Sequence, residues 1–80
     1  MPRFFFHVHD DLDVFDAEGT EFPDAAAATE GAIHSARSLM CETIMQGRIA
    51  LDHRIEVMDE KQALIGNVLF RDAVKIEGGT

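Results

Sequence analysis

The feature that most constrains the fold is an alternating, phenylalanine-rich segment over residues 3–9, Arg-Phe-Phe-Phe-His-Val-His. Successive side chains of a strand point to opposite sides of a sheet, so Phe4, Phe6 and Val8 would share one face. The other face would carry the remaining positions, Arg3, Phe5, His7 and His9. A strand with such an apolar face needs cover, so the segment predicts a sheet with a second layer packed on it.

One long helix is predicted to supply that layer. Asp24 is a good N-cap after Pro23, and Ala25–Ala28 has the highest helix propensity available. We expect the helix to run to about Gln46 and to end with Gly47 in the left-handed conformation. Its apolar positions recur at steps of three and four residues and predict one stripe facing the sheet: Ala25, Ala28, Ala32, Ile33, Ala36, Leu39, Met40 and Ile44.

The remaining segments complete a four-stranded, mostly antiparallel sheet. Residues 12–15 are predicted as a short second strand, 20–22 as extended chain, and 54–58 and 63–70 as the third and fourth strands. The prediction is therefore an α+β fold of strand, strand, helix, strand, strand, with the helix on one face. Antiparallel neighbours give the order 2-1-3-4, with residues 3–9 in the centre. Gly31 lies inside the helix at a cost of about 1 kcal/mol and is expected to mark a close approach.

A single helix covers one side of such a sheet, so the opposite side is expected to be exposed. We call it the back face, and its predicted members are Phe5, His7, His9, Ile65, Asn67 and Leu69. Monomers seldom expose large contiguous apolar patches, and such patches usually mark interfaces. We therefore predict a small binding or assembly module that forms a homodimer or binds another protein through this face or an adjacent edge. The alternative is that residues 73–76 fold back over it within one chain.

Composition limits the partners and the location. Seven Lys and Arg against fifteen Asp and Glu give a net charge of -8 at pH 7, which repels phosphate backbones and anionic lipids. We expect no nucleic-acid or membrane partner. The 80 residues are expected to form one domain, without a signal or membrane-spanning segment. The single cysteine, Cys41, fits a reducing interior, so a cytoplasmic location is expected.

His7 and His9 form the only closely spaced histidine pair. On a strand their rings point the same way, roughly 6.6 Å apart along the chain. Asp10, Asp11 and His53 are possible further ligands, but zinc needs three or four and local spacing fixes only two. We interpret the pair as part of a half-buried face and predict no cofactor. Metal or small-ligand binding through His7 and His9 is the alternative function.

No catalytic residue is predicted. Glu30, His34 and Ser38 have the order of a hydrolytic triad, but a helix ridge opposite the apolar stripe offers neither an oxyanion hole nor a cleft. The acidic segment 10–16 lacks the glycine and terminal glutamate of a calcium-binding EF-hand. Cys41 has no activating imidazole nearby in the helix. We expect a protein that is not an enzyme.

Four segments resemble a family of short bacterial proteins. They are residues 2–8 (PRFFFHV), 18–24 (EGTEFPD), 54–60 (RIEVMDE) and 69–74 (LFRDAV). In order and spacing they are similar to short proteins of unknown function abundant in rhizobia and related alphaproteobacteria, over nearly the whole chain. The resemblance implies no activity, cofactor or catalytic residue. It departs from the family after the first strand, where Asp10-Asp11 replaces the usual Asp-Gly.

Overall fold

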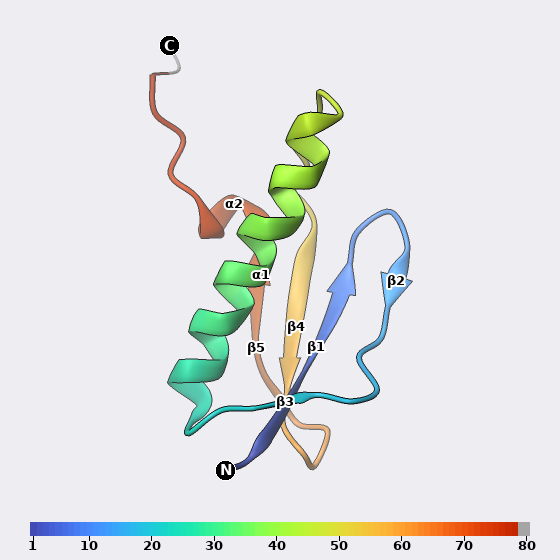
Figure 1. The fold of residues 1–80 in the computed structure, drawn as a ribbon, viewed down its shortest axis with the longest axis vertical. Coiled ribbons are helices and arrows are strands. Elements are labelled where there is room, and N and C mark those ends of the chain that lie inside the picture. Colours follow the sequence, from blue (N-terminus) through green and yellow to red (C-terminus); the bar gives the residue numbers. More distant parts are fainter. Residues whose placement is uncertain (79–80) are drawn as a thin grey trace.

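The computed structural model describes residues 1–78 and contains one sheet, one long helix and one short helix (Figure 1). The strands are β1 (Arg3–His9), β2 (Asp13–Val14), β3 (Thr20–Glu21), β4 (Arg54–Met58) and β5 (Leu64–Leu69). The helices are α1 (Ala25–Met45) and α2 (Phe70–Ala73). The predicted α+β fold is confirmed, because α1 packs against one side of an antiparallel sheet.

The sheet has the order β2-β1-β4-β5, and β3 pairs separately with the start of β1. The predicted order is therefore confirmed, with β1 and β4 in the centre. The prediction of four strands misses β3, in which Thr20 lies opposite Phe4. β1 is long enough to pair with two short strands along one edge, β2 at its end and β3 at its beginning.

Local sequence signals set both ends of α1. The Asp24 carboxylate accepts a hydrogen bond from the Ala27 N–H at 2.8 Å, which satisfies one of the unpaired donors of the first turn. At the other end Gly47 adopts a φ of 84°, and its N–H donates to the Ile44 carbonyl at 2.9 Å. A residue with a side chain would be strained in this left-handed region. The predicted N-cap and C-terminal glycine are both confirmed.

The core forms where α1 crosses β4 and β5. One residue per helical turn is buried in α1, namely Ala28, Ala32, Ala36 and Met40. The opposing side chains are Ile55 and Val57 of β4 and Val68 of β5, with Phe70 and Ala73 of α2 closing the end. Alanine has a small side chain, so the helix can approach the sheet closely along most of its length.

Phe22 covers the part of the sheet that α1 does not reach. Its ring stacks on Phe6 at a centroid distance of 5.7 Å and meets the edge of Phe4 at 6.2 Å. Gly31 marks a close approach of the helix to Phe22 rather than to the sheet itself: a Cβ at Gly31 would lie 2.7 Å from the Phe22 ring but 3.5 Å from the ring of Phe6. Phe22 thus fills the space between α1 and β1.

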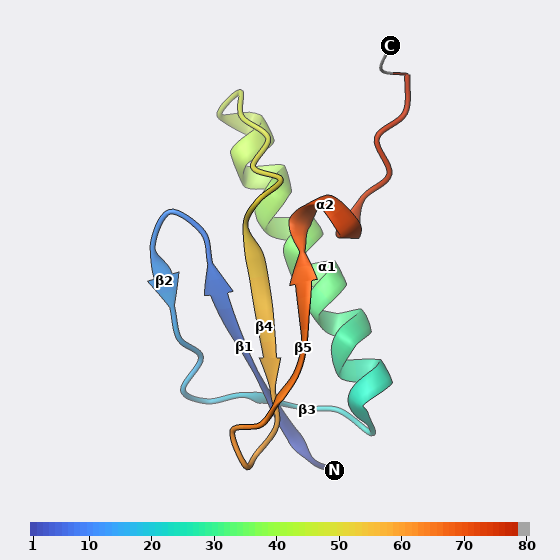
Figure 2. The ribbon, with the colours of Figure 1, turned by 180° about the vertical axis from the view of Figure 1, so that it is seen from behind.

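Two predictions about the helix stripe and the C-terminus are wrong. Ile44 is 52% exposed because α1 continues past the ends of the strands, so the buried stripe stops at Met40 (Figure 1). Phe70 does not end the fourth strand but begins α2, which turns to the helix side of the sheet (Figure 2). There the Arg37 Nε donates to the Ala73 carbonyl at 2.7 Å. The described part of the C-terminal segment therefore does not cover the back face.

A register shift changes the start of β5. Gly66 pairs with Val57, so an unbroken register would pair Ile65 with Met58. Leu64 pairs with Met58 instead. Such an irregularity re-aims the side chains around it, and a one-residue slip exchanges the two faces of a strand. Leu64 therefore shares the back face with Met58.

The contact between Gly31 and Phe22 can be tested by substitution. Gly31→Ala gains about 1 kcal/mol in helix propensity, but overpacking typically costs about 1–3 kcal/mol, and Phe4 and Phe6 hold the Phe22 ring in place. We expect a net decrease in the free energy of unfolding, measured in urea.

The matched control is Gly66→Ala, because a Cβ there meets no atom within 4 Å. Combining Gly31→Ala with Phe22→Leu should recover part of the loss, since the smaller side chain vacates the contact. A stabilised Gly31→Ala variant would contradict this account of the packing.

Candidate binding face

Three rows of side chains cross the back face from β1 through β4 to β5. The strand registers place Phe5, Met58 and Leu64 in the first row, His7, Glu56 and Asn67 in the second, and His9, Arg54 and Leu69 in the third. Paired residues of antiparallel strands project to the same side of the sheet. The face is therefore apolar at the first row and polar or ionic in its middle.

Five of the six residues predicted for this face share it. The exception is Ile65, which lies at the register shift and lines a separate hollow together with Phe4 and Ala25 near the start of α1. Leu64 takes the place expected for Ile65, opposite Met58. A pattern of alternation cannot reveal such a shift, because it assumes an unbroken strand.

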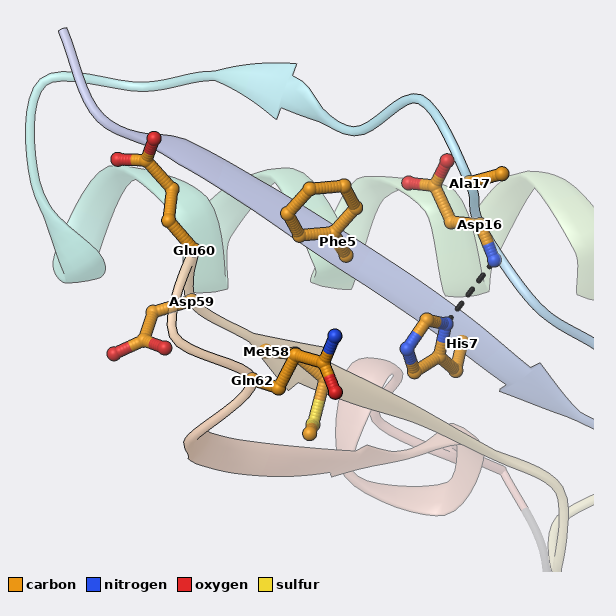
Figure 3. A pocket seen from close by; sticks show the side chains of 8 residues that line it. All are labelled: Phe5, His7, Asp16, Ala17, Met58, Asp59, Glu60 and Gln62. Carbon is orange, nitrogen blue, oxygen red and sulfur yellow. Dashed lines mark hydrogen bonds between the residues drawn. The ribbon is translucent and has the colours of Figure 1, made fainter.

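A hollow of about 370 Å³ opens beside the first row (Figure 3). It is lined by Phe5, His7, Asp16, Ala17, Met58, Asp59, Glu60 and Gln62. Phe5 and His7 project from β1 and Met58 from β4, while the acidic residues come from the connections at the two ends (Figure 3). The hollow therefore combines an apolar wall with acidic groups around it.

Asp16 anchors the segment between β2 and β3 to the edge of β1. Its carboxylate accepts hydrogen bonds from the Phe6 N–H at 3.2 Å, the Glu18 N–H at 3.2 Å and the Gly19 N–H at 3.0 Å. Partial burial alone would raise the pKa of Asp16, but these backbone donors together hold its pKa below the ordinary value. The charged Asp16 carboxylate thus accepts from the Phe6 N–H, in the part of β1 between β2 and β3 where no strand pairs with this edge.

The same residue orients His7. The Asp16 N–H donates to His7 Nδ1 at 3.1 Å, so Nδ1 is the acceptor and the neutral ring carries its proton on Nε2 (Figure 3). Phe15 packs against both histidines, with its ring centroid 5.3 Å from that of His7 and 6.1 Å from that of His9. Neither Phe15 nor Asp16 was predicted to belong to the face. Phe15 was expected as the last residue of the strand over 12–15, but β2 ends at Val14, and Asp16 lies in the connection that follows.

His9 is held between two carboxylates. Its Nδ1 lies 2.8 Å from Asp13 Oδ1, and its Nε2 pairs with Glu56 Oε1. The hydrogen bonds to Asp13 and Glu56 raise the pKa of His9, because both favour the doubly protonated ring. Only 15% of the side chain is exposed. His9 therefore links β2, β1 and β4 across the sheet.

These contacts bear on the metal hypothesis for His7 and His9. Among residues 1–78, no three His, Cys, Asp or Glu side chains are placed to hold a metal ion together. His53, the proposed distant ligand, instead packs on Phe70 at a centroid distance of 5.6 Å and lies 3.6 Å from an Asp11 carboxylate oxygen. The structure thus does not assemble the predicted histidines into a ligand set.

The other candidates from the sequence are dispersed on α1. Glu30, His34 and Ser38 are all exposed, and no hydrogen bond joins them in the described part of the chain. Cys41 is likewise an exposed free thiol. Across residues 1–78, no helix is both long and apolar enough to cross a membrane.

In a comparison with known protein families, a family model matches residues 3–71. This chain belongs to the family described as a domain of unknown function, DUF6894. The expected membership of a family of unknown function is thereby confirmed. The matched region runs from β1 to the start of α2 and contains every strand of the back face. No curated protein and no solved structure matches the chain.

The pairing of His9 predicts how stability depends on pH. A raised folded-state pKa means that the stabilising contribution is complete below the unfolded value of 6.5 and is lost as the pH rises through the folded value. A neutral ring has one N–H and cannot donate to both Asp13 and Glu56. The difference in melting temperature between wild type and His9→Gln should therefore be larger at mildly acidic than at alkaline pH.

Thermal unfolding followed by circular dichroism across this range measures the difference. His34→Gln is the control, because His34 is exposed on α1 and forms no ion pair with any residue of the described chain. Its difference from wild type should not vary in this way. A His9→Gln difference that grows with pH would contradict the proposed charge state.

Proposed function

We propose that this protein is a binding module, without enzymatic activity, that engages a protein partner through the back face of its sheet. The observation that carries the proposal is the hollow beside Phe5 and Met58, on a side of the sheet that neither α1 nor α2 covers. An apolar surface of this kind commonly serves as an interface.

The first row of the face supplies the apolar contact. Phe5 and Met58 are half-buried in the hollow, and Leu64 is 52% exposed beside them. Binding energy at protein interfaces concentrates in a few side chains that enter such hollows and lose water there. We therefore propose that one anchor side chain of the partner inserts between Phe5 and Met58.

The charges around the hollow favour a basic anchor. The Asp59 carboxylate is engaged by the N–H groups of Lys61 and Ala63, at 2.8 and 2.9 Å. Glu60 is exposed, and no ion pair of its carboxylate is present among residues 1–78. An arginine would place its apolar stem on Met58 and its guanidinium near Glu60, since this side chain combines an apolar body with a charged tip. The chain's net charge of -8 would favour the approach of such a partner.

The histidines support a structural rather than a catalytic role. His9 is occupied at both ring nitrogens and His7 at Nδ1, in each case by groups that connect strands or loops of this chain. Their contacts account for their presence without a reaction. With the exposed thiol of Cys41, the module is expected to act in a reducing compartment such as the cytoplasm.

The proposal is tested by selecting peptides from a random library on the immobilised protein. We expect enrichment of peptides with arginine or lysine beside apolar residues. Leu64→Ser should weaken the binding of selected peptides about fivefold or more, the effect of losing about 1 kcal/mol. Glu60→Gln should weaken it as well, with a smaller dependence on salt, because a charge contact is lost.

Ile44→Ser is the matched control, because Ile44 and Leu64 are both 52% exposed but Ile44 lies on α1, beyond the ends of the strands and away from the back face. It should leave peptide affinity unchanged. Peptides that bind the Leu64→Ser and Ile44→Ser variants equally well would refute the proposed role of the back face.

A further inference from the structure

The two edges of the sheet differ in whether their backbone groups are paired. Along the outer edge of β1, Val8 pairs with β2 and Phe4 with β3, and the Phe6 N–H between them donates to the Asp16 carboxylate. This edge is occupied over its whole length. β5 forms the opposite end of the sheet, and no further strand of residues 1–78 pairs with it (Figure 2).

The register shows which backbone groups of β5 point outward. The Phe70 N–H donates to the His53 carbonyl at 2.9 Å. Phe70 and His53 are each two residues from Val68 and Ile55, which lie opposite each other, so both pairs belong to the same register. Hydrogen-bonded and non-hydrogen-bonded pairs alternate along antiparallel strands. Val68 and Gly66 therefore bond toward β4, whereas the N–H and C=O groups of Asn67 and the N–H group of Leu69 face outward. In the described chain no other backbone or side-chain group forms a hydrogen bond with them.

β5 also lacks the features that keep edge strands apart. Natural edges carry charged residues, especially lysine, or proline, to prevent pairing with other chains. The sequence of β5 is Leu-Ile-Gly-Asn-Val-Leu, without charge or proline, in a chain that is 28% charged. Leu64, Ile65 and Asn67 are all exposed. Two molecules with a net charge of -8 repel each other over most of their surfaces, but no like charges meet along this strand.

We propose that the occupant of this edge is a second copy of the chain, paired through antiparallel β5 strands about a two-fold axis at Asn67. Such an interface is isologous, so the same surface serves both copies. Asn67 of one copy then lies opposite the partner's Asn67, and each donates its outward N–H to the other's carbonyl. Gly66, which has open space around its Cβ position, lies opposite the partner's Val68.

Charges at the two ends of β5 are compatible with this arrangement. Lys61 precedes the strand and Asp72 follows it, and both are exposed. Antiparallel pairing brings the end of each copy that carries Glu60 and Lys61 to the end of the other that carries Arg71 and Asp72, so each end offers a charge opposite to one on its partner. Parallel pairing would instead bring Lys61 to Lys61 and Asp72 to Asp72, so like charges would meet.

The paired strands would join the two sheets into one and place both back faces on the same side. This inference goes beyond the proposed binding role, because the edge can pair whether or not the back face holds a partner. The edge is tested by molecular mass and the face by peptide affinity, so either proposal can fail without the other.

Charge substitutions at Asn67 test the two-fold axis. Like charges directly opposite each other on paired strands are destabilising, so Asn67→Lys and Asn67→Asp should each shift the mass measured by sedimentation equilibrium from a dimer toward the 8.9 kDa of one chain. An equimolar mixture of the two variants should recover the dimer, because lysine then faces aspartate. The control is Gln46→Lys, at the exposed end of α1, which should retain the dimeric mass of the wild type.

Wild-type protein that is monomeric at the concentrations used for NMR spectroscopy would overturn the inference. So would a dimer that survives both Asn67 variants, since the contact would then lie elsewhere. Amide exchange on wild-type protein gives a test without substitution: protection of the Asn67 and Leu69 N–H groups should increase with protein concentration. Unprotected amides in protein of dimeric mass would also overturn it.

Discussion

The close fit of α1 against β4 is the contact on which the rest of the structure depends. Three alanines at successive turns, Ala28, Ala32 and Ala36, are fully buried against the fully buried Ile55 and Val57. Small side chains allow this approach, but they give the helix little width with which to cover a sheet. The cover of β1 therefore has to come from Phe22, and the space for Phe22 exists because Gly31 has no side chain. With both helices and Phe22 on one side, the other side of the sheet is covered only in part, where Phe15 packs on His7 and His9.

The parts of the fold that could be predicted depend on local signals or on regular alternation. Asp24 and Gly47 define the helix through capping and backbone conformation, which neighbouring residues do not change. The strand order follows once neighbouring strands are taken as antiparallel. In contrast, β3 and the loop held by Asp16 depend on contacts between distant residues, and neither has a periodic pattern. Ile44 was misplaced because periodicity gives the direction of a stripe but not the point at which the sheet beneath it ends.

The candidate face was also predictable only where regular alternation along a strand places its side chains. Phe5, His7 and His9 were placed by alternation along β1, and Asn67 and Leu69 by alternation along β5. The acidic partners of the histidines could not be assigned, since Glu56 is distant in sequence and Asp13 is one of several nearby aspartates. The histidine pair, which first indicates a ligand site, is engaged within the chain: His9 joins neighbouring strands, and His7 accepts a hydrogen bond from the connection that contains Asp16. The apolar first row and its hollow instead distinguish this surface.

The turn between β4 and β5 has a consequence for how the chain can vary in length. Asp59 accepts hydrogen bonds from Lys61 and Ala63, and Gln62 adopts a positive φ of 62°, so side-chain hydrogen bonds and backbone conformation together define the turn. The register shift that follows gives Leu64 to the back face while Val68 stays in the core. Deleting or inserting one residue here would shift the register of β5 by one residue and move its core side chains to the back face and its back-face side chains to the core. Relatives of this chain are therefore expected to tolerate altered side chains in this turn far better than an altered number of residues.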